Sequence, residues 1–479
     1  MSSLTRIGVD PKRRFRQVHF VGIGGTGMCG IAEVMLNLGH QISGSDQNAS
    51  PVTERLEQLG ARIHIGHHAD HLGDAKVVVI SSAIGRNNPE VKAAKARRIP
   101  IVPRAEMLGE LMRFRDGIAV AGTHGKTTTT SLVAAILFEG KMDPTFVIGG
   151  LLNSLGTNAR LGSGQFIVAE ADESDGSFLL LQPTMAVVTN IDNDHLSTYR
   201  NDFARLKRAF DEFLHHLPFY GLAVMCVDDP STAELAARIS RTVVTYGLSE
   251  QADIRALNVE QTAATMAFDV QLPGRNELMP VKLNLPGVHN VRNALAALAI
   301  GWELGIEDRA MQQALSGFAG IGRRFNVHGE IAVGQVKALF VDDYGHHPTE
   351  LDATLEAARS GWPERRLVAV FQPHRYTRTR DLLDDFARVL SQVDLLILAD
   401  VYAAGEVPIA GADSRALARA IRARGKVDPV LVDHPSDCRQ ILPSLVADDD
   451  LVLLLGAGDI GSAAADIYRD GFPEATNAH

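Results

Sequence analysis

The first hundred residues alternate short apolar runs with amphipathic stretches whose apolar positions recur every three or four residues. The apolar runs predict β-strands and the amphipathic stretches predict helices, so this region is expected to form a βαβ series with a parallel sheet. Gly39 and Gly60 each follow an amphipathic stretch, at a position where glycine often ends a helix. The predicted strands lie within 17–22, 40–46, 61–66, 75–84 and 99–104.

A second α/β block begins near residue 111, and its strand candidates are continuously apolar, as buried parallel strands are. From about 252 to 286 the pattern alternates, which predicts antiparallel strands. The alanine-rich stretch 289–305 then predicts a helix that ends at a glycine. The strand candidates of this block are 117–122, 165–172, 185–190, 222–229 and 242–247.

A third α/β block follows the segment GIGRRF at 320–325 and includes a predicted helix over 379–392. Its strand candidates are 336–347, 365–375, 394–402, 427–433 and 450–458. The pattern therefore predicts three consecutive α/β domains, which we place at 1–107, 108–323 and 324–479. This number of domains agrees with the length of 479 residues.

Composition narrows the class of protein. Apolar residues make up 46% and charged residues 22%, which is typical of a soluble globular protein. The net charge of −10 argues against a nucleic-acid-binding protein, which needs a basic face. No apolar run approaches the roughly 18 residues that span a bilayer, and the N-terminal stretch lacks the apolar core of a secretory signal. We therefore expect a cytoplasmic enzyme with no membrane insertion.

The segment AVAGTHGKTTTT at 119–130 resembles a phosphate-binding loop but lacks its first glycine, whose place is taken by Val120. The Gly125-Lys126-Thr127 core is complete. Such a loop offers backbone N–H groups to phosphate oxygens, a lysine to the β and γ phosphates, and a hydroxyl to Mg²⁺. We expect this loop to bind the phosphates of a nucleotide, and the alternative is a strand–turn–helix link with incidental threonines.

Two acidic segments, 170–175 and 190–195, also follow predicted strands of the second block. Because ligands bind beyond the carboxyl ends of parallel strands, these segments and the phosphate-binding loop should meet at one sheet edge. The set suits Mg²⁺-nucleotide chemistry. His195, beside Asp194, is a candidate metal or phosphate ligand, with an ordinary hydrogen-bonded histidine as the alternative.

Two loops match the pattern G-x-G-x-x-G, GIGGTG at 22–27 and GAGDIG at 456–461. Asp46 comes 22 residues after Gly24, where dinucleotide-binding folds place the acid that holds a ribose. Taken alone, this loop would indicate an NAD-dependent oxidoreductase, although the pattern is weakly specific. For the loop at 456–461 the default interpretation is close packing of a strand on a helix.

Histidines and arginines gather in two further places. The spacing of His64, His67, His68 and His71 fits one helix face, but Gly66 interrupts any helix. We therefore expect one or two of these histidines to contact a ligand, and not a four-histidine zinc site. The third block concentrates groups that bind phosphate and carboxylate or transfer protons. These are Arg323, Arg324, Asp342, Asp343, Tyr344, His346, His347, His374, Arg375, Arg378 and Arg380.

The ordered motifs GTHGKTTTT, EADESDGSF, TNIDNDH, PGVHNVRNALAA, GRRF, DDYGHHPTE and FQPHRYTRTR span nearly the whole chain. In this order they resemble the Mur ligase family of peptidoglycan synthesis. Together with the opening HFVGIGGTGMCGIAE and SGSD, they are most similar to the branch that adds the first amino acid. The resemblance implies a Rossmann-like domain for a UDP-sugar, a central P-loop ATPase domain with a mostly parallel sheet, and a Rossmann-like domain for the amino acid and ATP.

The resemblance also implies roles for individual residues. UDP-sugar contacts would be Gly24, Gly25, Asp46, His67, Ser82 and Glu173. ATP contacts would be Gly122, Thr123, His124, Gly125, Lys126, Thr127, Thr128, His289, Asn290, Asn293 and Arg324. The metal ligands would be Thr127, Glu170 and His195, and the amino-acid contacts Tyr344, His346 and Arg378. The residues that act in the reaction would be Lys126, His195, His346, Arg375 and Arg378.

The implied reaction is the ATP-dependent ligation of L-alanine to the lactyl carboxylate of UDP-N-acetylmuramate through an acyl phosphate. The reaction would use two Mg²⁺ ions, which Mn²⁺ could replace. The protein would be a monomer or a homodimer. The C-terminal domain would close over the site by bending at a hinge in residues 320–324. Three alternatives stay open on sequence grounds. They are a relative that attaches a recycled cell-wall tripeptide, a Rossmann oxidoreductase, and a non-catalytic P-loop regulator.

Overall fold

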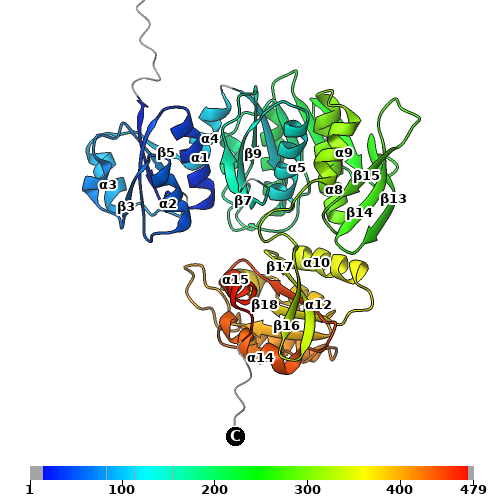
Figure 1. The fold of residues 1–479 in the computed structure, drawn as a ribbon. Coiled ribbons are helices and arrows are strands. Elements are labelled where there is room, and N and C mark those ends of the chain that lie inside the picture. Colours follow the sequence, from blue (N-terminus) through cyan, green and yellow to red (C-terminus); the bar gives the residue numbers. More distant parts are fainter. Residues whose placement is uncertain (1–14, 82, 114, 155, 473–479) are drawn as a thin grey trace, which may run out of the picture. The chain divides into compact units, whose positions relative to one another are not determined.

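The computed structural model describes residues 15–81, 83–113, 115–154 and 156–472 (Figure 1). The chain falls into two compact units, the first built mainly from residues before 256 and the second mainly from residues after 314. Three separate sheets organise the chain, and each carries helices of its own. Within the described residues, no helix combines the length and apolar character needed to cross a membrane.

The first sheet is entirely parallel, in the order β3-β2-β1-β4-β5. The strand order reverses between β1 and β4, which is the point where open α/β sheets bind ligands. Gly39 and Gly60 follow α1 and α2 with φ of +85° and +103°, as helix-ending glycines do. The Rossmann-like prediction is confirmed. The elements are β1 (Gln17–Val21), α1 (Thr26–Asn37), β2 (Gln41–Asp46), α2 (Pro51–Gln58), β3 (Arg62–Ile65), η2 (Ala69–Leu72), β4 (Val77–Ile80), α3 (Pro89–Ala96), β5 (Ile101–Pro103) and α4 (Arg104–Met112).

The second sheet has the order β15-β14-β13-β12-β11-β10-β6-β9-β7-β8. The pairs from β12 through β7 are parallel, as predicted. The pair β14–β15 is antiparallel, but β13 pairs in parallel with β12, so the expectation of antiparallel strands over 252–286 holds only in part. The strands are β6 (Asp116–Ala121), β7 (Thr145–Leu152), β8 (Thr157–Arg160), β9 (Phe166–Glu170), β10 (Met185–Val188), β11 (Leu222–Cys226), β12 (Thr242–Gly247), β13 (Ile254–Thr262), β14 (Thr265–Gln271) and β15 (Met279–Leu283).

The helices of this region include the predicted alanine-rich one, which is α8. Its central residues are fully buried, which explains why small alanines recur along it. The antiparallel pair β7–β8 escaped prediction because its residues alternate poorly. The helices are α5 (Lys126–Glu139), η3 (Ser177–Leu180), α6 (Phe203–His215), α7 (Pro230–Ala236), α8 (Val288–Glu303) and α9 (Asp308–Ser316).

The third sheet has the order β16-β17-β21-β18-β19-β20, parallel except for the hairpin β16–β17. The single helix predicted over 379–392 is two helices, because the backbone leaves the helical region at Leu382. The elements are β16 (Asn326–Val333), β17 (Val336–Asp343), α10 (Pro348–Gly361), β18 (Leu367–Phe371), α11 (Tyr376–Asp381), α12 (Leu383–Leu390), β19 (Leu395–Ala399), α13 (Ser414–Ala423), β20 (Val430–Val432), η4 (Pro435–Asp437), α14 (Cys438–Leu445), β21 (Leu451–Leu455) and α15 (Ile460–Asp470).

Candidate active site

The shortened phosphate-binding loop joins β6 to α5 and is braced from the neighbouring strand. Gly122 and Gly125 have φ of +135° and +82°, a region that side chains with a Cβ rarely adopt. A Cβ on Gly122 would collide with the Thr189 hydroxyl. The N–H groups of Thr123 and His124 donate to the main-chain and side-chain oxygens of Asn190, at 3.0 and 2.9 Å. These contacts from the end of β10 fix a loop that lacks the first glycine of the usual pattern.

Lys126 begins α5 and turns its ammonium group back onto the loop. Its Nζ donates to the main-chain oxygens of Gly122 (2.6 Å) and Thr123 (3.0 Å) and to the Glu173 carboxylate at 2.8 Å. Burial opposes the charge of Lys126, but the carboxylates of Glu173 and Asp172 outweigh it and raise the pKa of the ammonium group. Burial raises the pKa of Glu173 to about 7. Glu173 therefore lies against the ATP loop, whereas the family resemblance assigns it to the UDP-sugar.

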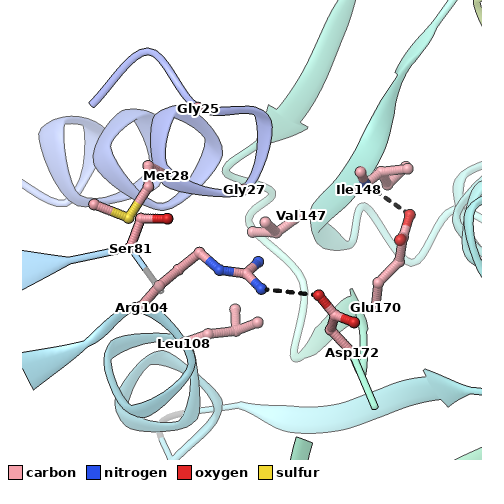
Figure 2. Close-up of a pocket in the computed structure, with 11 residues that line it drawn as sticks. Gly25, Gly27, Met28, Ser81, Arg104, Leu108, Val147, Ile148, Glu170 and Asp172 are labelled. Carbon is pink, nitrogen blue, oxygen red and sulfur yellow. Dashed lines mark hydrogen bonds and ion pairs between the residues drawn. The ribbon is translucent and has the colours of Figure 1, made fainter. Parts of the chain in front are cut away.

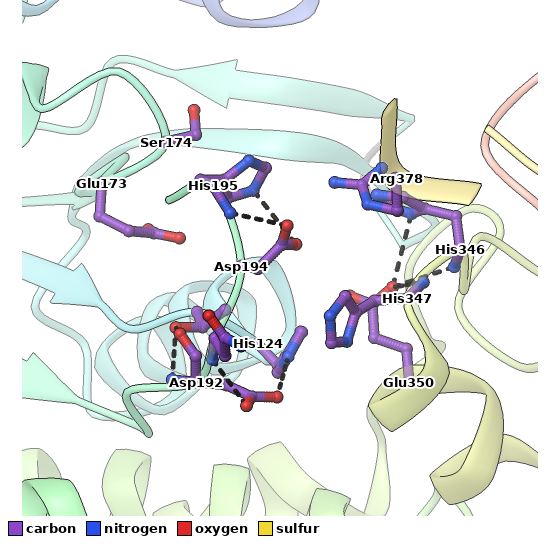
Figure 3. A network of polar contacts seen from close by, with 12 residues as sticks. His124, Glu173, Ser174, Asp192, Asp194, His195, His346, His347, Glu350 and Arg378 are labelled. Atoms are coloured by element: carbon purple, nitrogen blue, oxygen red, sulfur yellow. Dashed lines mark hydrogen bonds and ion pairs between the residues drawn. The ribbon is translucent and has the colours of Figure 1, made fainter. Parts of the chain in front are cut away.

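The three strand ends of the second sheet do meet, as the edge rule predicts. Strand β6 lies between β10 and β9, so the ATP loop is flanked by both acidic segments. The Glu170 carboxylate accepts from the Gly149 N–H at 2.6 Å. Figure 3 shows His124 with its Nε2 3.0 Å from an Asp192 oxygen. His195 has a left-handed backbone, with φ of +55°, and its Nε2 is 3.4 Å from Asp194 (Figure 3).

The first glycine loop closes one side of a cavity of about 250 Å³ (Figure 2). Asp46 accepts a hydrogen bond from the Gly24 N–H at 2.8 Å, so it holds the loop itself. Of the residues predicted to contact the UDP-sugar here, Gly25 lines the cavity, and Ser82 lies outside the described residues. The cavity lining is Gly25, Gly27, Met28, Ser81, Arg104, Leu108, Val147, Ile148, Gly149, Glu170 and Asp172.

Arg104 is the cationic residue that the sequence analysis missed. It begins α4, extends into the cavity and lies 3.4 Å from the Asp172 carboxylate (Figure 2). A Cβ added to Gly27 would collide with its guanidinium, so the third glycine of the loop makes room for an arginine. Ligands bind beyond the carboxyl ends of parallel strands, and Arg104 directly follows β5. The same rule that indicated the other ligand candidates would therefore have indicated Arg104.

The second glycine loop, at 456–461, has the structural role that was its default interpretation. The Arg323 guanidinium lies on Gly461 and donates to the Gly456 carbonyl. Gly458 packs against Gln372 and Tyr402. This loop therefore binds the side chain of Arg323, which belongs to the same compact unit.

The three residues predicted near the adenine nucleotide occupy α8. Asn293 accepts from the Thr129 hydroxyl at 3.2 Å and leaves no room for a Cβ on Gly125, so it is part of the ATP-loop wall. Asn290 donates to the Pro286 carbonyl at 2.7 Å. His289 lies over Gly287, where a Cβ would be 2.6 Å from its ring.

In the third sheet region, aromatic rings and arginines gather around the ends of β17 and β18. The guanidinium groups of Arg323 and Arg324 lie 5.2 and 5.1 Å from the centre of the Tyr344 ring. His346 packs edge-on against both Tyr344 and His374, with centroids 5.5 Å apart in each case. Arg375 starts α11 with φ of +71°, and Arg378, one turn later, lies 3.4 Å from the His374 ring. The predicted amino-acid residues are therefore neighbours.

Burial makes His346 and His374, the two histidines of this cluster, weak bases. It lowers the pKa of His346 to about 4, against the charge of Glu350, and the pKa of His374 to about 3. Arg378 and Arg375 lower the His374 pKa further. Both rings are therefore neutral and weakly basic at pH 7.

This arrangement predicts that acid destabilises the protein through His346. Its folded pKa is below the unfolded value of about 6.5, so its contribution is complete above pH 6.5 and is lost as the pH falls towards 4. At pH 5 the loss should be on the order of 2 kcal/mol. His346→Asn should flatten the fall in urea-unfolding stability between pH 7 and 5, and the exposed control His215→Asn should not. An unchanged slope in His346→Asn would contradict the assignment.

Three family patterns match the chain in order. "Mur ligase family, catalytic domain" matches residues 17–116, "Mur ligase middle domain" matches 120–301, and "Mur ligase, glutamate ligase domain" matches 323–458. The UDP-N-acetylmuramate–L-alanine ligase of Stenotrophomonas maltophilia (strain K279a) is 60% identical over 464 residues, which are 97% of each chain.

Solved structures agree with these matches. The UDP-N-acetylmuramate–alanine ligase of Thermotoga maritima has a TM-score of 0.80 at 29% identity and covers 94% of this chain and 97% of its own. The murein peptide ligase of Psychrobacter arcticus has a TM-score of 0.69 at 25% identity and covers 94% and 98%. The motifs, the three α/β sheets and the identity over nearly the whole length lead to one conclusion: this chain belongs to the Mur ligase family.

Proposed function

We propose that the protein is an ATP-dependent ligase that joins L-alanine to the lactyl carboxylate of UDP-N-acetylmuramate. The product would be UDP-N-acetylmuramoyl-L-alanine, a peptidoglycan precursor needed for cell shape and division. The main observation behind this proposal is that the loop around Lys126 meets two acidic segments at one edge of the second sheet. In addition, the chain is 60% identical to a UDP-N-acetylmuramate–L-alanine ligase. Family membership removes the oxidoreductase alternative, and we place the reaction in the cytoplasm, where ATP is available.

The reaction needs no protein nucleophile. The lactyl carboxylate attacks the γ-phosphate of ATP to form an acyl phosphate and ADP. The amine of L-alanine then attacks the acyl carbon, and inorganic phosphate leaves as the amide forms. The residues of this chain position the reactants and neutralise charge, as is usual in phosphoryl transfer.

We assign phosphate binding to the loop 122–128, with the Lys126 ammonium group exchanging Glu173 for phosphate oxygens. Asn293, on the loop wall, would help to place the nucleotide, with His289, Asn290 and Arg324 nearer the adenosine. The N–H groups at the start of α5 and the helix dipole favour anions there. Tyr344, His346, Arg375 and Arg378 would receive L-alanine and the leaving phosphate. His346 is the candidate acceptor of the amine proton, and its pKa of about 4 makes it a weak one.

The donor set at the ATP loop fits Mg²⁺. The Thr127 hydroxyl and the Glu170 carboxylate are oxygen donors, which Mg²⁺ prefers, while the His195 imidazole also suits Mn²⁺. Bound there, up to two such ions would neutralise phosphate charge. Helix α5 packs on β9, which ends at Glu170, so Thr127 and Glu170 lie on neighbouring elements.

We assign the UDP-sugar to the cavity beside the first glycine loop, with Gly24 and Gly25 at the diphosphate and Arg104 as a cationic contact. The cavity reaches from Gly25 to Glu170, and so from the nucleotide loop of the first sheet to the acidic segment of the second. We propose domain limits at 107/108 and 323/324. The C-terminal domain would close on substrate binding by bending at a hinge in residues 320–324.

Phosphate release from ATP tests this function. With UDP-N-acetylmuramate present, release should be fastest with L-alanine among the natural amino acids and the cell-wall tripeptide, and should require the UDP-sugar. Faster release with the tripeptide would keep the family and change the acceptor. No release with any acceptor would refute the ligase assignment.

A further inference from the structure

Glu90 is a fully buried carboxylate near the start of α3, outside both the ATP loop and the cavity. It accepts a hydrogen bond from the Ser45 hydroxyl at 2.6 Å. Its oxygens also lie 3.0 Å from His71 Nδ1, 3.3 Å from His67 Nδ1 and 3.8 Å from His19 Nε2. A buried charge is costly unless it is paired and hydrogen-bonded, so a cluster this complete points to a defined role.

The surroundings keep Glu90 ionised. Burial alone would raise its pKa, but the nearby His19 ring and the hydrogen bonds with Ser45 and His71 lower it to about 2. His64 stacks on His71, with ring centroids 4.3 Å apart, and completes the set of titratable groups around the carboxylate. The folded pKa is below the usual value, so Glu90 contributes stability above about pH 4.5 and loses it as the pH falls towards 2.

Ser45 connects this cluster to the first glycine loop. Its carbonyl accepts from the N–H groups of Gly22 and Ile23 at 2.8 and 3.0 Å. Its side chain binds Glu90 and also lies 3.0 Å from His67 Nδ1. The next residue, Asp46, holds Gly24. Glu90 therefore fixes, through one serine, the main chain that sets the shape of the loop.

We propose that Glu90 is a positioning residue that holds the first glycine loop and His67 in the conformation that binds the uridine diphosphate part of the substrate. This role rests on the proposed UDP-sugar specificity. Among the described residues, the polar partners of Glu90 are Ser45 and four histidines, none of which lines the cavity, so we infer that it acts through Ser45 and His67. Removing its charge should weaken UDP binding and leave ATP binding, which belongs to the second sheet, unchanged.

Isothermal titration of the full-length chain with UDP tests the proposal. Glu90→Gln keeps the shape and an acceptor for Ser45 but removes the charge, and it should weaken UDP binding about tenfold. Binding of a non-hydrolysable ATP analogue should stay within about twofold of wild type. Glu57→Gln, an exposed change on α2, is the matched control and should bind UDP like wild type.

Ser45→Ala is the second variant, because it breaks the link and leaves the carboxylate charged beside His67 and His71. It should weaken UDP binding in the same direction. Wild-type UDP affinity in both variants would overturn the proposal, even if their melting temperatures fall. Equal losses of UDP and ATP-analogue binding would also overturn it, since they indicate a general folding defect. A wild-type chain that binds no UDP would instead refute the UDP-sugar assignment.

Discussion

Lys126→Met is expected to lower the rate of phosphate release from ATP about a thousandfold. The Lys126 ammonium group lies at the start of α5 among three carboxylates, Glu170, Asp172 and Glu173, which raise its pKa. It therefore enters the reaction fully charged at pH 7. No other lysine lies in the loop 119–130, so the charge that the γ-phosphate needs there would be lost.

The choice of methionine separates chemistry from folding. In the free protein Lys126 pairs with buried Glu173, and an unpaired buried carboxylate is strongly destabilising. The Glu173 pKa is already raised to about 7, so Glu173 can take up a proton when the ammonium group is removed. We expect Lys126→Met to fold, with a stability that falls as the pH rises from about 4.5 to the raised pKa of Glu173, because the unfolded chain ionises this carboxyl while the folded protein keeps it protonated.

Steady-state phosphate release with saturating UDP-N-acetylmuramate and L-alanine measures the effect, with Lys282→Ala, an exposed change on β15, as the control. Circular dichroism at pH 6.5 should show native secondary structure in both variants. A loss of less than tenfold in a folded Lys126→Met protein would show that this loop is not the ATP site.

Much of this site follows from the sequence because parallel sheets impose a simple rule. Each strand that ends in a polar loop contributes that loop to one edge, so the sequence alone predicts that 122–128, 170–175 and 190–195 lie together. The same pattern of short apolar runs gives the three α/β blocks. The break at Leu382 was not predicted, because residues 379–392 carry a continuous helical pattern with no glycine or proline.

The pattern of apolar and polar residues does not predict which side chains pair when they are far apart in the sequence. The Lys126–Glu173 pair joins residues 47 positions apart, and Ser45–Glu90 joins residues 45 apart. Each residue alone has an ordinary role as a loop lysine, a strand serine or a helix-start glutamate. Only the fold shows that Glu173 faces the ATP loop and that Glu90 supports the first glycine loop.

Arg104→Ala should raise the KM for UDP-N-acetylmuramate about a hundredfold, the loss expected for a charge-assisted contact to phosphate. The guanidinium lies in the cavity between Gly27 and Asp172 (Figure 2). Its 3.4 Å contact with Asp172 is long for an ion pair, so a diphosphate can displace the carboxylate at small cost. KM values for ATP and L-alanine should stay within about threefold, because the Lys126 ammonium group keeps its contacts with Gly122, Thr123 and Glu173 in this variant.

Gly27→Ala provides an independent test of the same geometry, since its Cβ would collide with the guanidinium. It should raise the same KM, and the Gly27→Ala, Arg104→Ala double variant should be no worse than Arg104→Ala alone, because both changes remove one contact. Arg113→Ala, an exposed change at the other end of α4, is the control. Additive effects in the double variant would show that Gly27 acts separately from Arg104, and an unchanged KM in Arg104→Ala would place the diphosphate elsewhere.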